Sequence, residues 1–184
     1  MGLLFKYLSV NDVNITATGN PHQKLSRTAL LTAFGLTMFL FESGLPRPLP
    51  WAKPGLANIA TLLALYALGG TSAWAVTLIR VIAGSYILGS FFSPGFWLSL
   101  GGGVFSCGAM ILARRHARWF SLIGVSLLGA LAHVLAQITL AGILIVQRFE
   151  ILYLLPLMLW PALFAGFLVG VVAFLLLERM AVST

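Results

Sequence analysis

The sequence predicts an all-α membrane protein, folded as a bundle of six transmembrane helices. Of its 184 residues, 60% are hydrophobic and only 8% are charged, whereas a soluble domain carries about 25% charged residues. The mean hydropathy is +1.01. The apolar residues form runs, separated by short polar, basic or proline-rich turns, that approach or reach the length of a membrane-crossing helix.

The polar residues collect near the N-terminus, and this divides the chain into three expected regions. Residues 1–27 form a polar cytoplasmic segment, residues 28–179 form the six-helix transmembrane domain, and residues 180–184 form a short tail. This organisation leaves no room for a soluble catalytic domain.

The first three spans are expected at residues 28–43, 56–68 and 71–90. Prolines in the linker of residues 44–54 exclude a helix there and stiffen the chain. Because Trp51 suits a membrane surface, this linker is either an interface anchor or a lid over a cavity.

The last three spans are expected at residues 95–113, 119–146 and 151–177. The fourth contains Gly101-Gly102-Gly103, which permits close helix packing. The fifth is long enough to tilt. Two prolines interrupt the start of the sixth, so we expect a broken or interfacial piece before its main helix.

Basic residues orient the bundle. Six spans place both termini on one side, and seven cations lie on that side against three on the other. Cytoplasmic loops carry the excess of Lys and Arg, so both termini are expected in the cytoplasm and the proline-rich linker outside. We expect no nucleic-acid partner, because basic and aromatic residues do not interleave. The seven cations are Lys6, Lys24, Arg27, Arg114, Arg115, Arg118 and Arg179, and the three are Arg47, Lys53 and Arg148.

Arg80, near the middle of the third span, is the most informative polar residue. An arginine at that depth costs on the order of 3 kcal/mol, so it should face the bundle interior and have a partner. That partner is Glu42, in an ion pair that fixes packing, or else a backbone carbonyl or an anionic ligand. Gly84 lies one turn later on the same face and permits close approach of a ligand or a helix.

Other candidate binding residues lie in the stretch from Lys53 to Asn58 and in the fifth span. Backbone N–H groups at a helix start favour anions, although Asn58 could simply cap the helix and Lys53 could be an interface lysine. His133 and Gln137 share one helix face, either for a ligand or for an interhelical hydrogen bond. The candidate substrate-binding residues are Lys53, Gly55, Asn58, Arg80, Gly84, His133 and Gln137.

The residue inventory argues against catalysis by this chain. It has one aspartate, Asp12, three glutamates and no Walker motif, so neither ATP hydrolysis nor phosphoryl transfer is expected. The single cysteine, Cys107, excludes an internal disulfide and a cysteine-based metal cluster, and we interpret it as a packing residue. We expect no metal and no cofactor.

Several motifs together resemble the Gx transporter family, whose members are often labelled heptaprenyl diphosphate synthase component I. The resemblance covers residues 28–178. The synthase label conflicts with the residues, because prenyl diphosphate synthesis of that type holds magnesium with aspartate-rich pairs. The motifs are Phe41-Glu42-Ser43 with the proline-rich linker, Lys53-Pro-Gly-Leu-Ala-Asn58, Arg80-Val-Ile-Ala-Gly-Ser85, Phe92-Ser-Pro94, and Gly129-Ala-Leu-Ala-His133 with Gln137.

The family is similar to the substrate-binding S components of energy-coupling factor transporters. This implies a bundle in the bacterial cytoplasmic (inner) membrane, with an outward-opening cavity beneath the linker. It also implies docking of the first span on a coupling transmembrane subunit driven by ATPases. S components use an alanine-xxx-alanine pattern for this contact, and Ala29 and Ala33 match it.

The ligand implied by the resemblance is a small anionic or amphipathic metabolite, such as a flavin, a vitamin, or a quinone or isoprenoid precursor. The alternative is a membrane partner that does not transport. Such a protein would handle isoprenoid or quinone, or assemble a redox complex for extracellular electron transfer, and Arg80 and Glu42 would then be structural.

Overall fold

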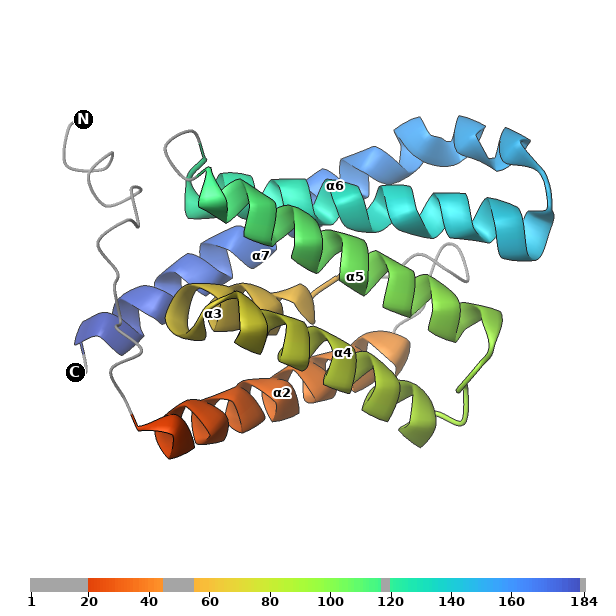
Figure 1. Ribbon diagram of the computed structural model, residues 1–184. Coiled ribbons are helices and arrows are strands. Elements are labelled where there is room, and N and C mark those ends of the chain that lie inside the picture. The colour runs from red at the N-terminus through yellow and green to blue at the C-terminus, as the bar shows by residue number, and fades with distance from the viewer. Residues whose placement is uncertain (1–19, 45–54, 117–119, 183–184) are drawn as a thin grey trace.

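The computed structural model describes residues 20–44, 55–116 and 120–182 (Figure 1). Helices dominate these residues and no strand occurs among them, which confirms the all-α prediction. The α-helices are α2 (Pro21–Gly44), α3 (Asn58–Leu68), α4 (Gly70–Ile87), α5 (Pro94–Arg115), α6 (Leu122–Ala141) and α7 (Leu155–Val182), and a π-helix η1 (Gly142–Val146) and a 3₁₀-helix η2 (Phe149–Leu154) lie between the last two.

Four stretches of the described chain are long and apolar enough to cross a membrane. They are Pro21–Gly44, Pro94–Arg115, Leu122–Val146 and Glu150–Met180. Among the other described α-helices, α3 is apolar but has only 11 residues, and α4 has 18 residues with Arg80 among them. The chain is therefore a membrane-embedded helical protein in which four helices qualify as spans by length and composition.

The helix ends differ from the expected spans in two places. The first helix begins at Pro21, because Asn20 accepts hydrogen bonds from Gln23 and Lys24 through its carbonyl oxygen and proline suits the first helical position. The last helix runs through Pro161 without a break. The expected piece before the main helix is the 3₁₀-helix η2.

The short helix α3 occupies the centre of the bundle. It touches α2, α4, α5 and α7, while α2, α4, α5, α6 and α7 pack against one another in that order. All 11 of its residues are buried. At 1.5 Å per residue it is roughly 16 Å long, about half of a hydrocarbon core of roughly 30 Å. Figure 1 shows that α2 begins and α7 ends at the same end of the bundle.

The main apolar cluster surrounds α3 and contains Cys107, as expected for a packing residue. Gly69 joins α3 directly to α4 with a φ of 97°, a conformation that other residues rarely adopt. The expected role of the glycine run in α5 is confirmed, since a Cβ added at Gly101 would lie 2.2 Å from Leu140 Cδ1 of α6.

Arg114, in the last turn of α5, holds the C-terminal end of α3. Its guanidinium donates hydrogen bonds to the carbonyl oxygens of Leu65 and Tyr66 and lies 4.7 Å from the centre of the Tyr66 ring. A cation at this end adds to the hydrogen bond that Leu65 O already accepts from Gly69 N, supplies a donor to Tyr66 O and complements the helix dipole. The opposite end of α3, which carries Asn58, is left inside the bundle.

Candidate functional site

The candidate site begins at the turn that leads into α3. Gly55 has a φ of 79°, and its carbonyl oxygen accepts a hydrogen bond from Asn58 N at 2.9 Å. A side chain at this position would be strained, and its Cβ would lie 3.4 Å from Asn58 Nδ2. Gly55 therefore places Asn58 at the buried start of the helix.

The side chain of Asn58 joins three helices. Its Oδ1 accepts a hydrogen bond of 2.6 Å from Arg80 Nη2 of α4, and its Nδ2 donates to Ser106 Oγ of α5 at 3.4 Å. The N-cap position of α3 is Ala57, and both of these hydrogen bonds of Asn58 leave its own helix. Its amide therefore acts as a cross-link between helices, and Arg80 pairs with an amide, a partner that the sequence did not predict.

Arg80 is only 3% exposed and keeps unused hydrogen-bond donors. Its Nε and Nη1 atoms have no partner in the part of the chain that the structure describes. A buried donor without a partner costs about 1–3 kcal/mol, and more when the group is charged. Arg80 can therefore gain a large amount of free energy from a ligand that supplies oxygen acceptors.

Glu42, at the end of α2, places a buried carboxylate beside the first turn of α3. Its Oε1 accepts a hydrogen bond of 3.3 Å from Ala57 N, and a negative charge at a helix start is stabilised by the helix dipole. Glu42 and Arg80 line the same small cavity. The hydrogen bond of Arg80 goes to Asn58, so the Glu42–Arg80 ion pair stays a prediction.

His133 and Gln137 both lie on the buried face of α6, as their spacing predicted. Gly102 of α5 makes room for them, since a Cβ added there would lie 2.8 Å from His133 Cε1 and 3.1 Å from Gln137 Cγ. His133 reaches the cavity that Arg80 lines. Gln137 lies one turn further on, and its amide atoms have no hydrogen-bond partner in the described ranges.

Two small cavities meet at Gly55, Asn58 and His133. Each has a volume of about 20 Å³, which is enough for about one water molecule. We call one the charged chamber, lined by these three residues with Phe39, Glu42, Ala57, Arg80, Val81 and Ser99. We call the other the apolar chamber, lined by the same three with Ser126, Ala130, Val134, Ala162, Gly166 and Val169.

The remaining candidates lie elsewhere. Gly84 faces α2, where its added Cβ would lie 2.4 Å from Phe39 Cδ1, so it serves close helix packing. Ala29 and Ala33 are exposed on α2. Lys53 and the linker with Trp51 lie outside the described residues. Within the described ranges, no three His, Cys, Asp or Glu side chains cluster as metal ligands would.

Serines are the site residues that sequence reasoning missed. Ser99 lines the charged chamber, Ser106 bonds Asn58, and Ser126 lines the apolar chamber. Serine in a helix commonly bonds its own backbone, as Ser99 does with Gly95 O at 2.8 Å, so its presence alone carries little signal. The usable signal was spacing, because Ser99, Gly102 and Ser106 repeat along one face of α5.

Comparison with known proteins gives one family. The sequence model described as heptaprenyl diphosphate synthase component I matches residues 31–176, from within α2 to near the end of α7. No curated protein and no solved structure matches the chain. The match includes Asn58, Arg80 and His133 and covers most of the sequence. The chain therefore belongs to the heptaprenyl diphosphate synthase component I family, the family that its motifs resemble.

Proposed function

We propose that this chain is the substrate-binding membrane subunit of an ATP-driven importer, similar to an S component of energy-coupling factor transporters. Its site for a small metabolite is the cluster of Asn58, Arg80 and His133 with Gly55. The observation that carries the proposal is the buried guanidinium of Arg80, whose Nε and Nη1 atoms lack partners among the described residues.

The short helix α3 supports a binding role for this cluster. Transporters commonly place the N-terminal end of a discontinuous helix near the membrane midplane, where it faces an anionic group of the substrate. Helix α3 has that length and burial, and Arg80 lies next to its first residue. Oxygen acceptors of a ligand would satisfy Arg80 and interact favourably with the start of the helix.

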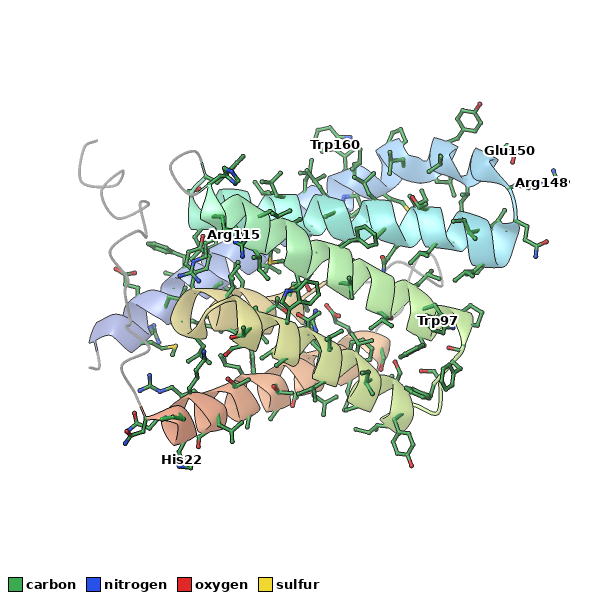
Figure 2. All side chains as sticks on the ribbon, viewed as in Figure 1. His22, Trp97, Arg115, Arg148, Glu150 and Trp160 are labelled. Carbon is green, nitrogen blue, oxygen red and sulfur yellow. The ribbon has the colours of Figure 1, made fainter. Side chains whose placement is uncertain are left out.

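The proposed topology has six membrane-inserted helices, with α3 and α4 added to the four long spans. Both termini are then cytoplasmic. The start of α2 and the end of α7 lie at one end of the bundle (Figure 1), together with Arg27, Arg115 and Arg179. Figure 2 shows Arg115 near this end and Arg148 and Glu150 at the other. This charge distribution favours placing the Arg115 end in the cytoplasm.

Import would need partners that supply energy. The exposed Ala29 and Ala33 on α2 offer a shallow surface on which a helix of a coupling subunit can pack closely. Purification of the tagged protein from its native membrane tests this proposal, with copurification of a coupling subunit and ATPases as the expected result. The double substitution Ala29→Leu and Ala33→Leu should abolish copurification of the coupling subunit and the ATPases. The control Phe164→Leu, on the exposed face of α7, should leave copurification unchanged.

The same purification distinguishes the importer proposal from the alternative function. Recovery of redox or isoprenoid-handling proteins, with ATPase subunits absent, would replace the importer proposal with a membrane partner that does not transport.

Native mass spectrometry tests the ligand assignment. We expect the wild-type protein to retain a small molecule that Arg80→Ala loses and Cys107→Ala keeps, because Cys107 is a packing residue in the apolar cluster. Retention of the molecule by a folded Arg80→Ala variant would remove Arg80 from the binding site.

A further inference from the structure

We infer that the charged and apolar chambers are two halves of one binding site, and that this site takes an amphipathic ligand. The ligand carries oxygen acceptors on its head and a flat or slender apolar body. The head binds beside Arg80, and the body lies between α6 and α7. The inference rests on the proposed function and specifies the substrate class of the same site.

The head half contains the donors of Arg80 that lack partners among the described residues, and the carboxylate of Glu42 lines the same chamber. Arg80 offers Nε and Nη1, and it is held in place by the 2.6 Å hydrogen bond from Nη2 to Asn58 Oδ1. A planar guanidinium matches carboxylate and phosphate oxygens, and it also donates to carbonyl groups. The head is therefore an oxygen-bearing group of this kind.

The body half is defined by small apolar side chains on two facing helices. Ala130 and Val134 of α6 and Ala162, Gly166 and Val169 of α7 line the apolar chamber. The helices approach closely there, since a Cβ added at Gly166 would lie 2.7 Å from Ala130 Cβ. The hydroxyl of Ser126 donates to Gly166 O at 2.7 Å and is thus already satisfied. A body that enters this half must therefore be flat or slender, and it must part α6 from α7, because the chamber holds only about one water molecule as it stands.

Asn58 and His133 line both chambers and form their junction. Because each chamber holds only about 20 Å³, a ligand that fills both must move these two side chains. The 3.4 Å hydrogen bond from Asn58 to Ser106 is long and weak, so it is the contact that Asn58 gives up most easily. Arg80 can keep its own bond to Asn58 during this movement.

Thermal unfolding of the purified protein with simple probes tests the inference. Acetate supplies the head alone, 1-naphthalenemethanol supplies mainly the body, and 1-naphthoate supplies both. At equal millimolar concentrations, we expect naphthoate to raise the unfolding midpoint by roughly 3 °C, with less than a third of that for either partial probe. Equal shifts from acetate and naphthoate would contradict a site with two halves.

Matched variants locate the probe. Arg80→Gln should abolish the naphthoate shift. Ala162→Val, which fills the apolar chamber, should weaken naphthoate binding at least tenfold, whereas Ala165→Val should not. Ala165 is half-buried on the same helix and is absent from the described lining of both chambers. If Ala162→Val does not fold, Val134→Ala enlarges the chamber instead and should strengthen naphthoate binding at least threefold relative to benzoate.

The outcomes also separate this inference from the proposed function. Equal behaviour of Ala162→Val and Ala165→Val, in a protein whose native ligand still depends on Arg80, overturns only the two-chamber site. Loss of any dependence on Arg80, for both the retained molecule and naphthoate, overturns the binding role itself.

Discussion

At the scale of single residues, the contact between Asn58 and Arg80 decides how the site is interpreted. Both side chains are at most 5% exposed, and the amide satisfies only part of the guanidinium. An arrangement built for packing alone would be expected to give a buried cation a full set of acceptors, because each missing one is costly. The remaining donors are the reason to regard Arg80 as a binding residue.

A double-mutant cycle measures what this contact contributes. We expect Asn58→Leu to lower the free energy of unfolding by about 1–3 kcal/mol, because it leaves Arg80 Nη2 without its acceptor. Replacing both residues by leucine should recover most of this loss, since no charge is then left buried. Denaturant unfolding in detergent gives the free energies, and Asn58→Asp, which keeps the acceptor, is the control. Additive effects of the two single changes would show that the residues do not interact.

Residue types also limit what the sequence could predict. Arg80, Asn58 and His133 are conspicuous because each interrupts an apolar run, and all three line one cavity in the structure. The hydrogen bond from Ala57 N to Glu42, by contrast, depends on how two helices meet in space. The sequence also did not indicate that Ser106 bonds Asn58, since a helical serine usually bonds its own backbone. Residue chemistry therefore pointed to these candidates, whereas their hydrogen-bond partners could be identified only from the structure.

At the scale of elements, α3 links the site to the basic end of the bundle. Its first residue contacts Arg80, and the carbonyl oxygens near its last turn accept hydrogen bonds from Arg114. The sequence predicted this short helix from its apolar run between a proline-rich linker and Gly69-Gly70. It did not predict the hydrogen bonds from Arg114 to α3, nor the π-helix after Ala141, because both depend on the geometry of neighbouring turns.

Arg114 and Arg115 form a matched pair for testing the hold on α3. We expect Arg114→Ala to destabilise the protein by about 1–3 kcal/mol, since it removes the donors to Leu65 and Tyr66 and the contact with the Tyr66 ring. Arg115 is exposed, so Arg115→Ala should change stability by less than about 0.5 kcal/mol. Thermal unfolding of the two variants side by side gives the comparison. Equal destabilisation would assign the effect to general loss of positive charge.

At the scale of the whole molecule, the two ends of the bundle carry different charge. Arg27, Arg115 and Arg179 are exposed at the end where α2 begins, and the turn at the other end exposes Arg148 with Glu150 (Figure 2). Length and hydropathy alone identify four spans, because α3 is short and α4 contains Arg80. Orientation therefore has to be tested directly.

Single cysteines at the two ends provide that test. The native Cys107 is buried and should react little with a membrane-impermeant maleimide, which makes the wild-type protein a background control. We expect Arg148→Cys to be labelled in cells with an intact inner membrane, and Arg115→Cys only after the membrane is opened. The reverse pattern would place the Arg115 end outside and move the proposed entry route to the cytoplasmic face.

The half-length of α3 also has an electrical consequence. In the proposed topology, a site at its N-terminal end lies about midway through the field that a membrane potential sets up. Moving one elementary charge across 100 mV changes its free energy by about 2.3 kcal/mol. When the cell interior is negative, moving a monovalent anion from outside to a site halfway through the field therefore costs about 1 kcal/mol. In oriented proteoliposomes, 100 mV should weaken naphthoate binding roughly fivefold and leave the uncharged naphthamide unaffected. A protein that captures anions at this depth would thus bind them best in poorly energised cells, whereas a neutral or zwitterionic substrate would be held equally well at any potential.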